Sequence, residues 1–246
     1  MTEYLLTFTI GFLASIISGI AGGGAGFITS PLFILMGLPP QVVIATAKFG
    51  ALGITLGGFF TFRKTEFVQW KYVFFLSVLS GTAGVIGSFW LLSLDEDVIE
   101  KGIGILMLCS LPILLYKKDS GIVRKVTSKI SKIIGSILFF IIAILQASFG
   151  SGIGTLIPVV MTNLFGFTSL EANATRKIPG MVVALVSLAI FMFYSAVDYK
   201  LGICILVGTY IGSTIGTKIA IKNGDVFVKR FLIVVIILLS VKLLVF

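Results

Sequence analysis

Long apolar stretches separated by short polar loops cover almost the whole chain, in two sets with one charged segment between them. The stretches run approximately over residues 4–20, 27–38, 42–62, 72–94 and 98–116, then over 133–149, 153–165, 172–197, 201–221 and 226–246. Most of them have the ~20 residues that a helix needs to cross a bilayer. The pattern therefore predicts an all-α polytopic membrane protein.

Glycine clusters interrupt this pattern once in each set. Gly22-Gly23-Gly24-Ala25-Gly26 precedes the second stretch, and Gly150-Ser151-Gly152-Ile153-Gly154 precedes the seventh. A helix broken inside a membrane is tolerated only where the freed backbone is buried in protein or lines a cavity. Matched breaks in two halves indicate a transport site near the midplane.

The two sets form an internal repeat with a constant offset of 129 residues. The matched pairs include glycines, lysines and one Ala-Thr element: Gly23/Gly152, Gly37/Gly166, Ala45-Thr46/Ala174-Thr175, Lys48/Lys177, Val68/Val197, Lys71/Lys200 and Gly87/Gly216. We divide the chain into a first membrane repeat (1–116), a basic cytoplasmic linker (117–132) and a second membrane repeat (133–246).

Loop charges predict that the repeats have inverted topology. The basic linker is assigned to the cytoplasm, which leaves the acidic loop around Asp97 outside and the Arg63-Lys64 loop inside. The counterpart of the acidic loop, Lys222 to Arg230, is basic, so it falls on the cytoplasmic side. Both termini are then expected outside. Such inversion requires an odd number of crossings per half, or three crossings plus a re-entrant hairpin.

The length of the second stretch favours the hairpin over two full crossings. It has about 12 residues, or roughly 18 Å of helix, which is shorter than the hydrocarbon core. The predicted fold is therefore two inverted repeats, each with a glycine-broken re-entrant or discontinuous helix plus three spanning helices. Small residues at Ala83/Gly87 and Gly212/Gly216 predict close helix contacts.

Composition narrows the function classes. The chain is 57% hydrophobic and 12% charged, with a net charge of +9 and no histidine. Its basic residues are not grouped on a soluble domain, so nucleic-acid binding is not expected. Cys109 and Cys204 both lie in apolar stretches, which suggests neither a disulfide nor a metal site. A cleavable signal peptide is not expected, because Glu3 and no basic residue precedes the first apolar run.

All ten acidic residues lie in loops or at the ends of stretches. Glu171 is explained by a capping box with Thr168 at the start of a helix. Without a carboxylate or imidazole at mid-depth, we expect no enzyme activity, catalytic residue, metal ligand, cofactor or proton relay.

Three cations lie inside stretches instead. Lys48 and Lys177 are about 12–14 Å from their helix starts, close to mid-depth, although either could snorkel to the interface. Arg176 has Ala47 as its counterpart, and its guanidinium could turn toward the cytoplasm. Pro179 predicts local unwinding at Arg176-Lys177.

The lysines and the glycine breaks together predict an anion site. Each break is followed by a helix whose free N–H groups and dipole favour a negative ligand. Neutral hydrogen-bonding candidates include Gln146, Asn163 and Asn173. We expect substrate contacts from Gly23, Gly24, Ala25, Gly26, Thr46, Lys48, Gly152, Gly154, Thr155, Thr175, Arg176 and Lys177.

The chain resembles the sulfite exporter TauE/SafE family over essentially its whole length. The resemblance is carried by the glycine break running into Pro31-Leu32, the Ala-x-Thr neighbourhoods at 43–48 and 173–177, and the turns Trp70-Lys71 and Tyr199-Lys200. Pro31 has Val160 as its counterpart, and Ile153 interrupts the second glycine run. The resemblance implies an inner-membrane, multi-pass permease for sulfite, sulfonates or sulfoacetate.

The leading hypothesis is a secondary transporter that exports a small anion bound between the two broken helices. An anion channel and a Na⁺-coupled importer of a small organic or sulfur-containing anion are the alternatives. A membrane enzyme fits less well, because the chain has no histidine and no carboxylate at mid-depth from which to build a nucleophile-base pair or a metal site. A purely structural membrane protein fits less well, because buried paired cations are costly without a ligand. The expected partners are the small anion and the lipid bilayer, and homodimer formation stays open.

Overall fold

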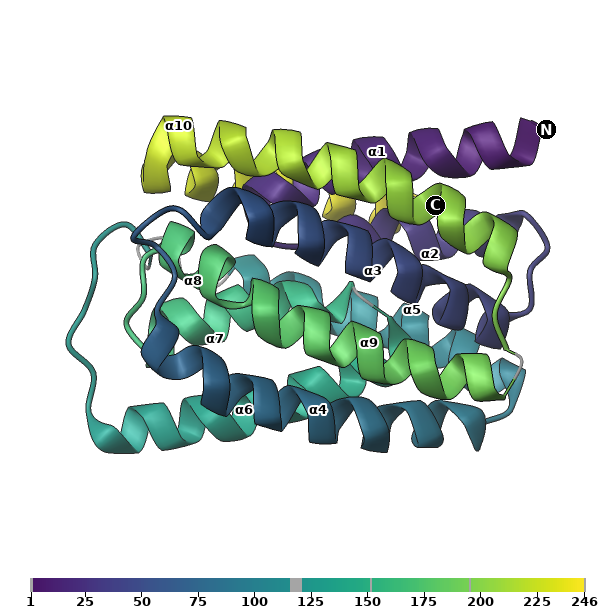
Figure 1. Ribbon diagram of the computed structural model, residues 1–246, viewed down its shortest axis with the longest axis horizontal. Helices are drawn as coiled ribbons and strands as arrows, with labels where there is room; N and C mark the ends of the chain where they lie inside the picture. Colours follow the sequence, from purple (N-terminus) through teal and green to yellow (C-terminus); the bar gives the residue numbers. More distant parts are fainter. Residues whose placement is uncertain (1, 116–120, 151, 195, 246) are drawn as a thin grey trace.

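Every regular element is a helix in the computed structural model, which describes residues 2–115, 121–150, 152–194 and 196–245 (Figure 1). The helices are α1 (Thr2–Ala21), α2 (Ala25–Leu35), α3 (Pro40–Phe62), α4 (Trp70–Leu92), α5 (Glu96–Leu115), α6 (Lys129–Phe149), the 3-10 turn η1 (Ile153–Thr155), α7 (Leu156–Leu164), α8 (Ser169–Thr175), α9 (Lys177–Phe193) and α10 (Tyr199–Val245). Six segments are long and apolar enough to cross a membrane. The predicted class, an all-α polytopic membrane protein, is confirmed.

The loops gather at two opposite ends of the bundle. At the linker end, which we define by residues 63–69, 121–128, 165–168 and 222–225, Lys125 N donates to Gly166 O at 2.9 Å and Leu170 N donates to the Asp225 carboxylate at 2.7 Å. The N-terminal end comprises Tyr4, residues 36–42 and 93–95, Tyr194 and residues 196–200. There Gln41 Nε2 donates to Leu94 O at 3.0 Å.

Two helical hairpins enter the bundle from these two ends. Helices α6 and α7 begin and finish at the linker end, where Ser131 Oγ donates to Leu164 O at 2.9 Å. Helices α1 and α2 begin and finish at the N-terminal end (Figure 1). The returning helices α2 and α7 have 11 and 9 residues, so they span about 16 and 14 Å and are too short to cross a bilayer. The chain thus adopts the hairpin arrangement rather than two crossings at each break.

The two halves interlock. Helix α4 packs on α6 and α9, and its counterpart α10 packs on α1 and α3, so each contacts helices of the other half. Predicted small residues lie in these contacts: Gly87 faces Ile144 O, and Gly216 faces Ile16 O, so closely that a methyl group at either glycine would overlap the oxygen. Glycine permits this approach because it has no Cβ.

Two hydrogen bonds relate the halves by exchange of equivalent residues. Gln69 N donates to Thr175 Oγ1, and Asp198 N donates to Thr46 Oγ1, both at 3.0 Å. Each residue of one pair lies 129 positions from its counterpart in the other. The first bond lies toward the linker end and the second toward the N-terminal end, so equivalent loops lie at opposite ends of the bundle.

Two helix boundaries differ from the apolar stretches. The last two stretches form two helical segments within α10 that meet directly at Gly224, whose non-helical dihedrals, φ 78° and ψ −179°, break the helix there without a longer loop. The stretch 172–197 is divided at Arg176, where α8 ends and α9 begins. Pro179 has no N–H to continue the α8 ladder, as expected, but Arg176 keeps φ −69° and ψ −12°, so the interruption is one residue long.

Candidate functional site: a cavity at the hairpin tips

The tips of the two hairpins meet inside the bundle. A Cβ placed on Gly23 would lie 2.8 Å from the Cα of Thr155 and 3.0 Å from its Oγ1, so the first tip packs directly against the second. Gly24, at φ 101°, has nothing within 4 Å of an added Cβ. The Gly152 carbonyl accepts hydrogen bonds from both the N–H and the hydroxyl of Thr155, which closes the second tip into a tight turn. Glycine is required at Gly24 by the backbone dihedral and at Gly23 by the contact.

A small cavity lies between these tips and the helices that cross beside them. Its volume is about 20 Å³, which accommodates one water molecule. The lining residues are Ser18, Gly23, Ala25, Gly26, Ala51, Ile54, Thr55, Gln146, Arg176 and Gly180. None of them is acidic, and one is a cation.

Arg176 is that cation, and it points inward. Its guanidinium donates to the Gly22 carbonyl in the first tip and lies near Gly154 in the second: a Cβ on Gly154 would be 3.3 Å from Arg176 Nη2. The side chain therefore bridges the two tips and does not turn toward the cytoplasm. Its exposure is intermediate although it lies deep in the bundle, because it borders the cavity.

Gln146 is a polar residue that lines the cavity together with Arg176. The residue is 5% exposed, and its Oε1 has no hydrogen-bond partner in the described part of the chain. Oε1 lies so close to Gly154 that a methyl group there would overlap it. Asn173 has a comparable orphan oxygen, while its Nδ2 donates to Gly19 O at 2.9 Å. Buried amides without partners are costly, so both carry unused hydrogen-bonding capacity.

Lys48 lies outside the cavity lining. The residue is 3% exposed, and its ammonium donates to the carbonyls of Gln146 at 2.9 Å and Ala147 at 2.8 Å. These carbonyls belong to the last turn of α6, whose final carbonyls lack intrahelical partners. The ring of Phe191 covers the ammonium at 5.9 Å. Lys48 therefore caps the broken helix and does not snorkel to an interface.

Lys177 is also buried, at 2% exposure, and does not line the cavity. Its side chain lies against Gly58 of α3, where an added Cβ would be 2.9 Å from Nζ. The two predicted lysines are thus both buried but are not brought together around the cavity.

The remaining predicted residues divide between the cavity and the ends. Gly23, Ala25, Gly26 and Arg176 line the cavity, while Gly24, Gly152, Gly154 and Thr155 form the tips beside it. Thr46 and Thr175 instead accept the loop hydrogen bonds that relate the two halves. Asn163 donates to Val159 O within its own helix.

Sequence reasoning missed the walls contributed by α3 and α9. Ala51 and Gly180 both line the cavity and are repeat equivalents, 129 residues apart. A pair of small residues at matched positions in the middle of two spans was the signal that could have found them. Ser18, Ile54 and Thr55 carry no such signal.

This arrangement suits an anion better than a cation. The first-turn N–H groups of α2 lie at the cavity, where Ala25 and Gly26 line it, and the Arg176 guanidinium faces it. The capped end of α6 presents its negative terminus to Lys48 rather than to the cavity.

Comparison with known proteins agrees with this description. A family model described as "Sulfite exporter TauE/SafE" matches residues 7–243. A "Probable membrane transporter protein" of Haemophilus influenzae is 24% identical over 97% of this chain and 93% of its own length. A "Probable membrane transporter protein ORF9" of a Sinorhizobium species is 26% identical over 96% and 90%.

A plant relative matches over a shorter segment. The Arabidopsis thaliana "Sulfite exporter TauE/SafE family protein 3" is 54% identical over 41 residues, or 17% of this chain and 9% of its own. No solved structure matches this chain significantly.

Proposed function

Because the chain belongs to the sulfite exporter TauE/SafE family, a family of membrane transporters, we propose that it carries a small anion through the cavity at the hairpin tips. The chain is accordingly a multi-pass membrane transporter and not an enzyme. Sulfite, a sulfonate or sulfoacetate is the proposed class of substrate, and the plasma membrane is the proposed location.

The observation that carries the proposal is the position of Arg176. A guanidinium that borders a cavity and bridges two hairpin tips has no acidic neighbour among the lining residues. An oxyanion would pair with it and would also accept from the first-turn N–H groups at Ala25 and Gly26. Gln146 also lines the cavity, and its side-chain amide would complete the site by donating a neutral hydrogen bond from Nε2.

The proposed carrier alternates between two open states. A cavity of about 20 Å³ holds one water molecule, whereas sulfite has four heavy atoms, so the tips must separate before the anion enters. The exchanged hydrogen bonds and the opposite loop positions support inverted repeats, which permit the same movement toward either side. Lys48 would serve by holding the end of the broken helix α6 in place.

Export is the proposed direction. With an inside-negative potential, outward movement of one negative charge is downhill by about 2.3 kcal/mol per 100 mV. No carboxylate lines the cavity to couple a proton, which agrees with transport along the potential. A channel would instead give single-channel currents, and an importer would require a Na⁺ gradient.

The test is flux of sulfite and small sulfonates through proteoliposomes, at set potentials, with and without Na⁺. Arg176→Gln is expected to raise KM at least about tenfold, since losing a charged hydrogen bond costs about 1.5–3 kcal/mol. Arg176→Lys should recover part of the affinity, because it restores the charge without the bidentate geometry.

Arg63→Gln is the matched control, since Arg63 is exposed at the linker end and should change KM less than about threefold. Unchanged KM in Arg176→Gln for every anion transported would refute the assignment of the cavity as the anion site.

A further inference from the structure

We propose that Glu171 is a gating residue, whose contacts hold the linker end closed and must break for the cavity to open there. The inference rests on the proposed carrier function and adds the element that controls one of its two open states.

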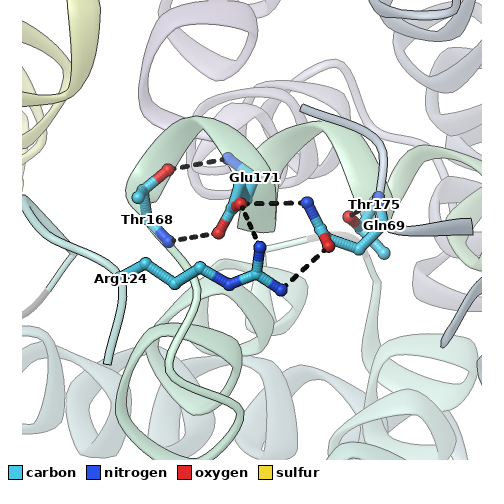
Figure 2. A network of polar contacts seen from close by, with 5 residues as sticks. All are labelled: Gln69, Arg124, Thr168, Glu171 and Thr175. Carbon is cyan, nitrogen blue, oxygen red and sulfur yellow. Dashed lines mark hydrogen bonds and ion pairs between the residues drawn. The ribbon is translucent and has the colours of Figure 1, made fainter. Parts of the chain in front are cut away.

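Glu171 joins three segments that are far apart in the sequence (Figure 2). Its carboxylate accepts from Gln69 Nε2 at 2.9 Å, lies 3.4 Å from Arg124 Nη1, and accepts from the backbone N–H of Thr168 at 3.0 Å. Gln69 belongs to the α3–α4 loop and Arg124 to the linker. Arg124 also donates to Gln69 Oε1 at 3.1 Å, so the three side chains form a closed ring of contacts.

An apolar cluster adjoins this ring, because Val68 precedes Gln69 and Leu170 precedes Glu171. Phe62 and Val68 from the α3–α4 connection pack with Leu170 and Ala174 of α8 and with Val228 of α10, all buried. The segments that the polar ring joins are therefore also packed together through apolar side chains.

The N-terminal end lacks the polar ring at the equivalent positions. The repeat counterpart of Glu171 is Val42, which has no carboxylate to join the loops, and the counterpart of Gln69 is Asp198. In place of the ring, Val42, Val197 and Asp198 line an open cavity of about 560 Å³ together with Tyr4, Tyr199 and Lys200. Val68 and Val197 are equivalents, and both pack against apolar clusters, yet Val68 is buried whereas Val197 is half-buried and borders the open cavity.

The central cavity lies midway between the closed and the open end. Gly180 follows Glu171 by nine residues, and Ala51 follows Val42 by nine, so each wall is about 13 Å along its helix from its end. In a carrier that alternates between two open states, one end closes as the other opens. The described state is closed at the linker end, and the Glu171 contacts are what favours it.

The ring is suited to reversible opening. The Arg124 side chain is 58% exposed, so its ion pair with Glu171 is screened by water and weak. The contacts that tie Glu171 to its own helix start are separate, because Thr168 and Glu171 form the predicted capping box. A glutamine at position 171 keeps this box while losing the charge, so the closure can be weakened without unwinding α8.

The experiment uses two reporter cysteines at equivalent positions, Val68→Cys and Val197→Cys, each in full-length protein carrying Cys109→Ser and Cys204→Ser. The rate of maleimide labelling is measured in proteoliposomes without any substrate. Glu171→Gln should raise labelling at position 68 and lower it at position 197, each by about threefold or more, as a shift between two states requires. Glu66→Gln, which removes an exposed carboxylate from the same loop, should change neither rate.

Opposite changes in labelling at the two positions distinguish a residue that controls opening from one that only stabilises the local structure. If labelling rises at position 68 while position 197 is unchanged, Glu171 only stabilises the local structure and the proposal is wrong. Unchanged labelling at both positions would also overturn it. Arg124→Gln, at an exposed position, repeats the test if Glu171→Gln does not fold. Because no anion is present, the result is independent of whether the substrate assignment is correct.

Discussion

Replacing Lys48 by methionine separates two roles for a buried lysine. Methionine keeps most of the apolar contact, including the Phe191 ring, but donates no hydrogen bond to Gln146 O or Ala147 O. If Lys48 caps α6, as the contacts indicate, the variant should lose stability rather than substrate affinity.

The magnitude follows from the two bonds. Each hydrogen bond from a charged donor contributes about 1.5–3 kcal/mol, so their loss costs about 3–6 kcal/mol. Removing the ammonium also removes its desolvation penalty, which offsets part of that cost. A net loss near 2 kcal/mol corresponds to a fall in Tm of about 4–8 °C for a chain of this size.

The assay is thermal unfolding in detergent, measured beside the KM for anion flux. Lys71→Met is the matched control, because Lys71 is exposed at the start of α4 and should change stability by less than about 0.5 kcal/mol. The expected result is a lower Tm for Lys48→Met and a KM within about threefold of the parent, under 0.7 kcal/mol.

The opposite result would refute the reasoning. A variant that unfolds at the parental temperature but binds the anion 10-fold or more weakly, a loss of about 1.4 kcal/mol or more, would make Lys48 a ligand. The interpretation of α6 as a lysine-capped helix would then be wrong.

Two further predictions concern packing and topology. Gly53→Ala should lower stability by about 1–3 kcal/mol, because its methyl group would overlap Thr209 Oγ1 and Leu206 O in α10. Gly104→Ala should instead raise stability by about 0.5–1 kcal/mol, because a Cβ added at Gly104 has nothing within 4 Å and alanine has the higher helix propensity. Chemical denaturation measures the free energy of unfolding of both variants. Single cysteines at Asp97 and Asn223, both exposed, should be labelled from opposite sides of the membrane; labelling from one side would disprove inverted topology.

Part of the fold could be predicted because lipid imposes one local rule on every residue. A bilayer satisfies no backbone polar group, so spans must be helical and must be apolar in sequence. The same rule made the glycine breaks visible as exceptions. The capping box at Thr168 and Glu171 was also readable, because both of its hydrogen bonds join residues three positions apart.

The placement of the cations depended on tertiary structure. Lys48, Arg176 and Lys177 look alike in sequence, as charges near the middle of spans. Lys48 donates hydrogen bonds to α6 carbonyls that are 98 and 99 residues away in the sequence, and Arg176 donates to a carbonyl that is 154 residues away. The position of a residue along its helix follows from the helix rise, but the direction in which its side chain points depends on which helices pack beside it.

The exchange of contacts between halves also came only from the structure. The repeat shows that 69 and 198 are equivalent, yet nothing local indicates that each pairs with a threonine of the other half. Sequence thus determined the helices, their breaks and the repeat, since these follow from local chemistry and its period. Only packing decided that one arginine faces the cavity and that Gln69, Arg124 and Glu171 meet at one end, because those contacts depend on atoms brought together from distant parts of the chain.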